Sequence, residues 1–115
     1  MLVAVDFDGV LYPGVGEHEV EDHVLPLYHF PGPLNIVTGR WESSRGKVLA
    51  WLKKHHFRVE SLVMVPNSAL GGNPMEFKRK ELVGFDLYIT DDPVEARSLA
   101  TRKLRVLCLE DTTLH

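Results

Sequence analysis

Short apolar runs alternate along the chain with longer stretches in which apolar residues recur at helical spacing. Five of the runs have the length of buried strands, and turn residues such as Gly39 and Pro66 close two of them. The five runs cover residues 2–7, 34–38, 62–65, 85–90 and 104–109. Because these runs are apolar on both faces, they favour a parallel sheet that helices cover on both sides.

Helical spacing predicts three helices between the strands, and their ends carry typical capping signals. The predicted helices cover residues 42–55, 75–83 and 93–102, with a weaker candidate at 21–28. Lys53 and Lys54 stand near the end of the first helix, where cations suit the helix dipole, and Asp92 precedes Pro93 as a candidate N-cap of the third. The alternation of strands and helices predicts a three-layer α/β/α sandwich with right-handed crossovers.

The composition is that of an ordinary soluble globular protein, with 44% hydrophobic and 25% charged residues. We predict one domain over residues 1–115, because a division would leave pieces too small to bury a core. The only cysteine, Cys108, lies in an apolar run where we expect it to be buried. A single cysteine, no signal-peptide pattern after Met1 and no apolar run of membrane-spanning length together predict a cytoplasmic protein.

Polar side chains gather where the predicted strands end. Asp6 and Asp8 follow the first strand, Thr38 ends the second, and Asp91 and Asp92 follow the fourth. In open parallel sheets, ligands bind outside the carboxyl ends of the strands. We therefore expect these residues, which are far apart in the sequence, to meet at one crevice.

Several carboxylates in one crevice repel one another unless a cation lies among them. A ligand set of oxygen atoms without His or Cys favours Mg²⁺. Asp6, one or both of Asp91 and Asp92, and a backbone carbonyl near Asp8 are the candidate metal ligands. A carboxylate beside such a metal can attack phosphorus, because the metal offsets its repulsion from the phosphoryl oxygens.

The remaining chemistry of a phosphoryl-transfer site is also present. Asp8 is the candidate general acid/base, and Gly9 allows a tight turn beside the ligand. Thr38 and the amide of Gly39 are candidates for holding phosphate oxygens, and a lysine would neutralise the remaining charge. These residues predict a phosphohydrolase whose nucleophile is Asp6.

Four segments in order resemble the motifs of the haloacid dehalogenase-like (HAD) superfamily. Residues 5–11 (V-D-F-D-G-V-L) resemble its first motif, and residues 36–40 (I-V-T-G-R) resemble its second. Phe77-Lys78 resembles the third, a lysine that opens a helix, and residues 87–92 (L-Y-I-T-D-D) resemble the fourth. The four segments span most of the chain.

The resemblance implies a role for each matching residue. Asp6 would be the nucleophile that forms an aspartyl-phosphate, and Asp8 would be the general acid/base. Thr38 would bind the phosphoryl group, and Lys78, or alternatively Lys80, would stabilise its charge. The enzyme class that follows is a phosphoric monoester hydrolase.

The resemblance also implies the metal site and the sheet order. Asp91, with or without Asp92, would hold Mg²⁺ together with Asp6 and the carbonyl of Asp8. The family's usual five-stranded parallel sheet has the order 5-4-1-2-3, which places the first strand at the centre. The segments between the motifs are too short for a separate domain, so the chain resembles a member without a cap domain.

An uncapped, open site suggests a phosphate at the end of a macromolecule, a phosphopeptide, or a small substrate covered by a second subunit. Thr38-Gly39-Arg40, followed by Trp51-Leu52, is similar to the phosphatase domains of polynucleotide kinase-phosphatases, which implies that Arg40 assists phosphate or substrate binding. A nucleic-acid end is therefore one candidate substrate. The formal net charge of −3 gives no argument for nucleic-acid binding, although it allows a local basic patch.

Two other hypotheses remain open. A protein with this fold and these acids can bind phosphorylated ligands or act in regulation without turnover. A receiver-like signalling domain also uses clustered acids, Mg²⁺, threonine and lysine, but it needs an aspartate after the third strand, where this chain has Pro66-Asn67. His18 and His23, which lie among acids, are interpreted as part of a charged flap rather than as metal ligands.

Overall fold

The structure is a computed structural model that describes residues 1–12, 32–66, 73–109 and 113–115. The described residues form one sheet, three α-helices and a short 3-10 helix. The strands are β1 (Val3–Val5), β2 (Leu34–Trp41), β3 (Val59–Val65), β4 (Leu87–Thr90), β5 (Arg105–Cys108) and β6 (Thr113–Leu114). The helices are η2 (Glu42–Ser44), α2 (Arg45–Lys54), α3 (Pro74–Glu81) and α4 (Pro93–Leu99).

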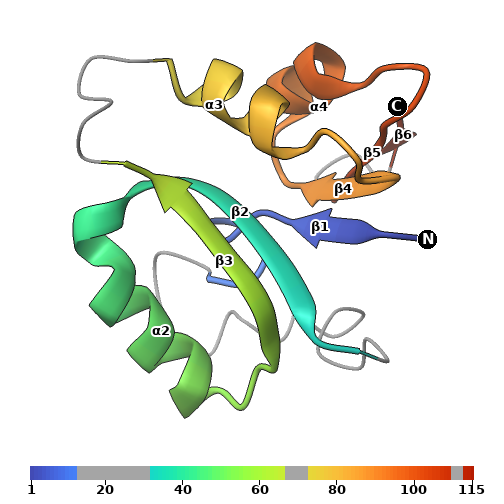
Figure 1. The fold of residues 1–115 in the computed structure, drawn as a ribbon. Helices are drawn as coiled ribbons and strands as arrows, with labels where there is room; N and C mark the ends of the chain where they lie inside the picture. Colours follow the sequence, from blue (N-terminus) through green and yellow to red (C-terminus); the bar gives the residue numbers. More distant parts are fainter. Residues whose placement is uncertain (13–31, 67–72, 110–112) are drawn as a thin grey trace.

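The sheet has the order β3-β2-β1-β4-β5-β6 (Figure 1). The first five strands are parallel, and read from β5 to β3 they follow the expected order with β1 at the centre. The prediction of a purely parallel, five-stranded sheet was incomplete, because β6 adds an antiparallel strand beside β5. In β6, Leu114 pairs with Leu107 and Thr113 pairs with Cys108.

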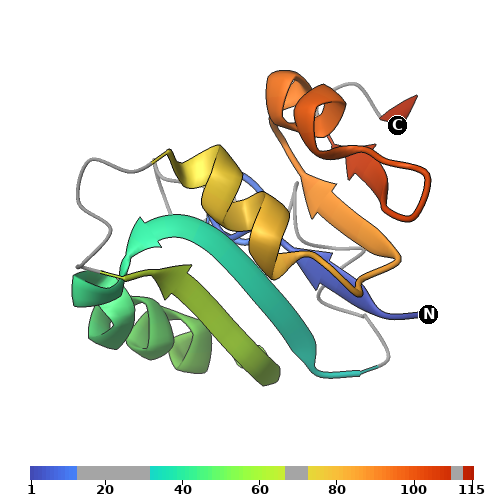
Figure 2. The same ribbon diagram turned by 45° about the horizontal axis from the view of Figure 1, so that its top comes forward.

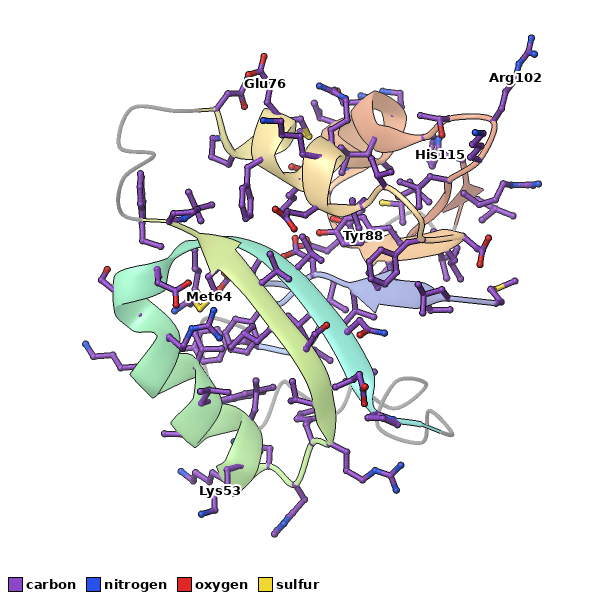
Figure 3. The ribbon with its side chains drawn as sticks, viewed as in Figure 1. Lys53, Met64, Glu76, Tyr88, Arg102 and His115 are labelled. Atoms are coloured by element: carbon purple, nitrogen blue, oxygen red, sulfur yellow. The ribbon has the colours of Figure 1, made fainter. Side chains whose placement is uncertain are left out.

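Helices cover both faces of the sheet, as the apolar strands predicted. α2 packs on one face, and α3 and α4 pack on the other, which Figure 1 and Figure 2 show from two directions. Two buried clusters fill the spaces between the layers. Figure 3 labels Met64, in the cluster on the α2 side, and Tyr88, in the cluster on the side of α3 and α4.

The central strand shows why its run is apolar throughout. Ala4 belongs to the cluster beneath α3 and α4, whereas its neighbour Val5 belongs to the cluster beneath α2. Successive side chains of a strand point to opposite faces, so both faces of β1 need apolar residues. This burial fixes the position from which the chain leaves the sheet at Asp6.

The bounds of several elements differ from those predicted. β2 does not end at Gly39 but continues to Trp41, and its pairing with β3 shifts between Val37 and Trp41. The predicted helix from 42 begins instead as η2 and becomes α-helical only at Arg45. The candidate helix at 21–28 and the flap with His18 lie outside the described residues.

Two further predictions have a structural outcome. Cys108 is buried, as its apolar run predicted, and it is a free cysteine. Among the described residues, the helices are too short or too polar to cross a membrane.

Candidate active site

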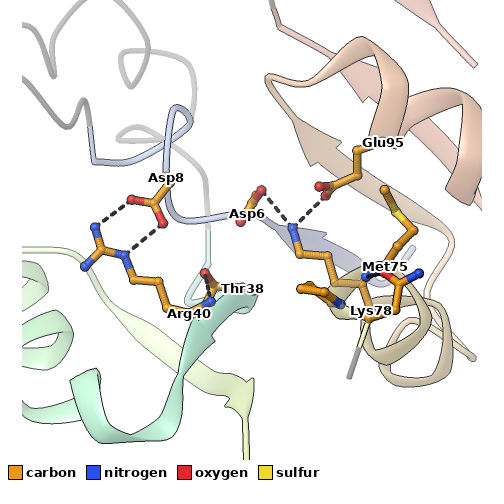
Figure 4. A pocket seen from close by; sticks show the side chains of 10 residues that line it. Asp6, Asp8, Thr38, Arg40, Met75, Lys78 and Glu95 are labelled. Carbon is orange, nitrogen blue, oxygen red and sulfur yellow. Dashed lines mark hydrogen bonds and ion pairs between the residues drawn. The ribbon is translucent and has the colours of Figure 1, made fainter. Parts of the chain in front are cut away.

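A cleft of about 470 Å³ lies at the carboxyl ends of the central strands, beside the beginning of α3 (Figure 4). Six of the residues proposed from the sequence line it together: Asp6, Asp8, Thr38, Gly39, Arg40 and Lys78. Asn73, Pro74, Met75 and Glu95 complete the lining. The predicted convergence at one crevice is present for Asp6, Asp8 and Thr38, but Asp91 and Asp92, which were expected there too, do not line the cleft.

Asp6 is held in place by the sheet and by its neighbours. Its backbone amide donates to the carbonyl of Ile89 on β4 over 2.9 Å, which continues the pairing of the central strands. Its carboxylate accepts from the amide of Phe7 through Oδ1 at 2.7 Å and from Nζ of Lys78 through Oδ2 at 3.0 Å. Only 7% of the residue is exposed, so the cleft presents a carboxylate with a fixed orientation.

Lys78 is the lysine that the cleft contains. α3 begins at Pro74, after Asn73 caps its first turn, and it points Lys78 into the interior. Lys78 is buried, whereas Lys80, two residues further along the same helix, is exposed. The helix geometry thus places Lys78 rather than Lys80 beside Asp6.

Glu95 is a site residue that the sequence interpretation missed. Its Oε1 accepts from Nζ of Lys78 at 2.7 Å and from the hydroxyl of Tyr88 at 3.0 Å. The hydroxyl of Tyr88 also lies 3.2 Å from the carbonyl of Val37, so it links β2 to α4. A signal was present in the sequence, because Glu95 is an acid on the same helical face as the apolar residues Ala96 and Leu99.

Two buried carboxylates therefore share one ammonium group. Burial raises the pKa of Asp6 to about 6 from an ordinary value of 3.8, and the charge of Glu95 adds to the increase while Lys78 opposes it. Burial lowers the pKa of Lys78, but the two carboxylates outweigh it and leave that pKa raised. The cluster contains two carboxylates, those of Asp6 and Glu95, and one ammonium group. A further cation beside Asp6 would therefore be stabilised by the remaining negative charge.

Asp8 and Arg40 form a second charged pair on the other side of the cleft. Nε of Arg40 donates to Oδ2 of Asp8 at 2.8 Å, and Nη2 donates to Oδ1 at 2.7 Å. The hydrogen bonds that Arg40 donates to the Asp8 carboxylate raise the pKa of Arg40. The guanidinium of Arg40 contacts Asp8 and lines the cleft, and its predicted contact with the substrate stays a prediction.

Thr38 and Gly39 lie inside β2 rather than after it. Thr38 is buried, and its Oγ1 accepts from the backbone amide of Arg40 at 3.2 Å. A Cβ atom added to Gly39 would stand 3.5 Å from Pro74 and 3.8 Å from Lys78, so the strand passes close to α3 at this point. The close approach brings the backbone of β2 beside the side chain of Lys78 in the lining of the cleft.

The paired acids after β4 have separate positions. Asp92 caps α4, because its Oδ1 accepts from the amides of Val94 at 2.9 Å and Glu95 at 3.4 Å. This is the structural role that its place before Pro93 predicted, and its role as a metal ligand stays a prediction. Neither Asp91 nor Asp92 is among the described residues that line the cleft.

Asp91 lies against the turn that carries Asp8. Gly9 has a φ of +77°, and a Cβ atom at this position would overlap the carboxyl group of Asp91. Glycine is therefore required here for two reasons, the left-handed backbone and the contact with Asp91. The contact places the Asp91 carboxylate directly beside the Asp8-Gly9 segment.

We expect Gly9→Ala to destabilise the protein more than Gly84→Ala does. Both glycines have positive φ, 77° and 95°, so alanine costs about 1–2 kcal/mol at either position from the backbone alone. Only Gly9 also has a neighbour that a Cβ would overlap, since nothing lies within 4 Å of an added Cβ at Gly84. Thermal unfolding of the two variants measures the difference, and equal losses of stability would show that the Asp91 contact is unimportant.

The expected magnesium ligands are sparse. Across the described ranges, no three side chains of His, Cys, Asp or Glu are grouped so that they could hold a metal ion. The predicted set contains the carboxylates of Asp6 and Asp91, with or without that of Asp92, and the backbone carbonyl of Asp8. The residues fit this set to the extent that Asp6 belongs to an anion-rich cluster and Asp91 touches the segment that holds the carbonyl.

Comparisons with family models, with curated proteins and with solved structures found no match. The four motif-like segments therefore remain a resemblance, and no relative assigns a role to any residue. The case for a function depends on the cleft, which contains two ion pairs. One is the buried pair of Asp6 and Lys78, and the other is the pair of Asp8 and Arg40.

Proposed function

We propose that the protein is a Mg²⁺-dependent phosphohydrolase of the HAD type that cleaves a phosphate monoester through an aspartyl-phosphate on Asp6. The observation that carries this proposal is the contact between the buried carboxylate of Asp6 and Nζ of Lys78, in a cleft that Thr38 and Asp8 also line. The order of the parallel strands, with β1 at the centre, supports the HAD-like fold on which the proposal depends.

The reaction has two steps. In the first, an oxygen of the Asp6 carboxylate bonds to phosphorus while the bond from phosphorus to the ester oxygen breaks, and Asp8 gives the leaving oxygen a proton where it needs one. In the second, the oxygen of a water molecule bonds to phosphorus, the bond to Asp6 breaks, and the water proton passes to Asp8. The products are an alcohol and inorganic phosphate, and Asp6 is again a carboxylate.

Lys78 and β2 are suited to the charge of the phosphoryl group. The ammonium of Lys78 is fixed between Asp6 and Glu95, at 3.0 and 2.7 Å, so it needs no reorganisation when the phosphoryl oxygens arrive. Thr38 and Gly39 on β2 line the same cleft and provide hydroxyl and amide donors. Preorganised donors of this kind stabilise the charge that develops during transfer.

The chain also supplies a place for the metal. Asp6, Asp91 and the carbonyl of Asp8 would hold Mg²⁺, which when bound neutralises phosphoryl charge. A cation beside Asp6 would offset the negative charge that Asp6 and Glu95 share over one lysine. The substrate stays open to experiment, and an end of a nucleic acid, a phosphopeptide and a small ester covered by a second subunit are the candidates.

Hydrolysis of p-nitrophenyl phosphate tests the proposal. We expect phosphate release that disappears when EDTA removes divalent cations and returns when Mg²⁺ is added in excess. Circular dichroism before and after EDTA treatment shows whether the chain stays folded without metal. Folded protein that hydrolyses neither this ester nor phosphorylated DNA, RNA and peptide ends in Mg²⁺ would contradict the proposal.

A second candidate function is phosphate binding without turnover. The ion pair between Asp8 and Arg40 favours it, because both oxygens of the proposed acid/base are engaged by a guanidinium. Titration calorimetry with inorganic phosphate and Mg²⁺ distinguishes the two functions when combined with the hydrolysis assay. Binding without hydrolysis of any ester in the panel supports the binding protein.

A further inference from the structure

Arg40 binds Asp8 through two nitrogen atoms of its guanidinium group. The two hydrogen bonds, from Nε at 2.8 Å and from Nη2 at 2.7 Å, reach both oxygens of the carboxylate. Such a bidentate pair fixes the plane of the carboxylate as well as its position, which a single bond or a lysine does not do. Figure 4 shows this pair on the opposite side of the cleft from Lys78 and Glu95.

The guanidinium is itself held by aromatic rings. Its central carbon lies 5.2 Å from the ring centre of Phe7 and 5.1 Å from that of Tyr12. These two rings stack on each other at 5.4 Å with an angle of 6°, and Trp51 packs edge-on against both. Arg40 is therefore restrained by cation–π contacts as well as by its ion pair.

The backbone around Asp8 is equally fixed. The amides of Leu11 and Tyr12 both donate to the carbonyl of Phe7, at 2.9 Å each, and the amide of Gly9 donates to the carbonyl of Tyr12 at 2.8 Å. The turn that carries Asp8 is thus closed on itself. With the backbone held by the turn and the carboxylate held by Arg40, Asp8 has one well-defined place in the cleft.

We propose that Arg40 is a positioning residue that orients the Asp8 carboxylate as the general base for hydrolysis of phosphorylated Asp6. This inference rests on the proposed function, and it deepens it by giving Arg40 a role in the second step. Each carboxylate oxygen has two acceptor sites, so a carboxylate that accepts two bonds from Arg40 can still accept one from water. The water oxygen bonds to phosphorus, its proton passes to Asp8, and the electron pair of the breaking bond returns to Asp6.

The role differs from the one that the sequence resemblance implied for Arg40. A residue that binds the substrate phosphate contributes to affinity, so its loss raises KM and weakens inhibition by inorganic phosphate. Where the leaving group needs no proton from Asp8, a residue that orients this base contributes only after the ester bond is broken. Its loss slows kcat, leaves phosphate affinity unchanged and makes the phosphorylated protein accumulate.

Arg40→Gln tests the inference with p-nitrophenyl phosphate, whose leaving group departs without a proton. We expect kcat to fall about 100-fold, with inhibition by inorganic phosphate unchanged and a larger phosphorylated fraction of the protein at steady state. The mass of the intact chain during turnover measures that fraction. Arg40→Lys, which keeps the charge but loses the bidentate geometry, should give an intermediate kcat.

Arg45→Gln is the matched control, because Arg45 also pairs with a carboxylate, that of Glu42, but lies outside the cleft. We expect it to behave as the wild-type protein. A rise in KM and in the inhibition constant of phosphate for Arg40→Gln, without accumulation of phosphorylated protein, would overturn the inference and make Arg40 a substrate ligand. A wild-type protein with no turnover would instead overturn the proposed function, and the role of Arg40 with it.

Discussion

Asp6→Asn is expected to reduce Mg²⁺-dependent phosphate release by about 10⁴-fold or more, the loss typical of removing a nucleophile. Asparagine has nearly the same size and keeps an oxygen for Lys78, but a neutral amide does not attack phosphorus as a carboxylate does. The initial rate of p-nitrophenyl phosphate hydrolysis measures the effect. Glu81→Gln removes an exposed acid from α3 and serves as the matched control with unchanged activity.

The same substitution should not unfold the protein. The pKa of Asp6 in the folded chain, about 6, lies above its ordinary value of 3.8, so this carboxyl group stabilises the fold below pH 4 and loses that contribution as the pH rises through 6. At pH 8 the loss amounts to about 3 kcal/mol, and asparagine does not incur it. We therefore expect a Tm for Asp6→Asn at or above that of the wild-type protein at pH 8 in EDTA. An active Asp6→Asn protein would contradict the account.

Lys78→Met is expected to have the largest effect on stability. Lys78 is buried, and its ammonium is the cation shared by Asp6 and Glu95. Removing one partner of a buried ion pair leaves uncompensated charge, which costs about 3–5 kcal/mol. Thermal and urea unfolding at pH 8 measure the loss.

The control and the pH dependence make this prediction specific. Lys80→Met changes an exposed lysine on the same helix, and its effect should stay within about 0.5 kcal/mol. Without the ammonium, the pKa of Asp6 rises further, and protonation at low pH removes the uncompensated charge. The deficit of Lys78→Met should therefore be smaller at pH 5 than at pH 8. A deficit that is equal at both values, or shared by Lys80→Met, would show that lost packing and not charge is responsible.

Features that are set within a single strand or helix were predictable from the sequence. The apolar runs located β1 to β5, and Asp92-Pro93 located the beginning of α4, because each signal is local. The convergence of Asp6 and Thr38 also followed, since the carboxyl ends of parallel strands face one crevice, whereas the place of Lys78 there was implied only by the resemblance. The same argument placed Asp91 and Asp92 at this crevice, but neither lines the cleft.

How these residues pair was not predictable, because pairing depends on distances between elements. The sequence alone left Lys78 and Lys80 as alternatives, and only the rotation of α3 against the sheet decides between them. Glu95 was missed because its partners, Lys78 and Tyr88, come from two other elements. The contact between Arg40, which lies within β2, and Asp8, which follows β1, likewise joins two elements and was not predicted.

Trapping the phosphorylated aspartate is the most direct test of the central claim. Borohydride reduces an acyl phosphate to an alcohol, so the protein quenched during turnover of p-nitrophenyl phosphate should carry homoserine in place of aspartate. We expect peptide mapping by mass spectrometry to find this change at Asp6 alone, and in larger amount in Arg40→Gln. An unmodified Asp6 in protein that is turning over, or homoserine at another position, would contradict the account.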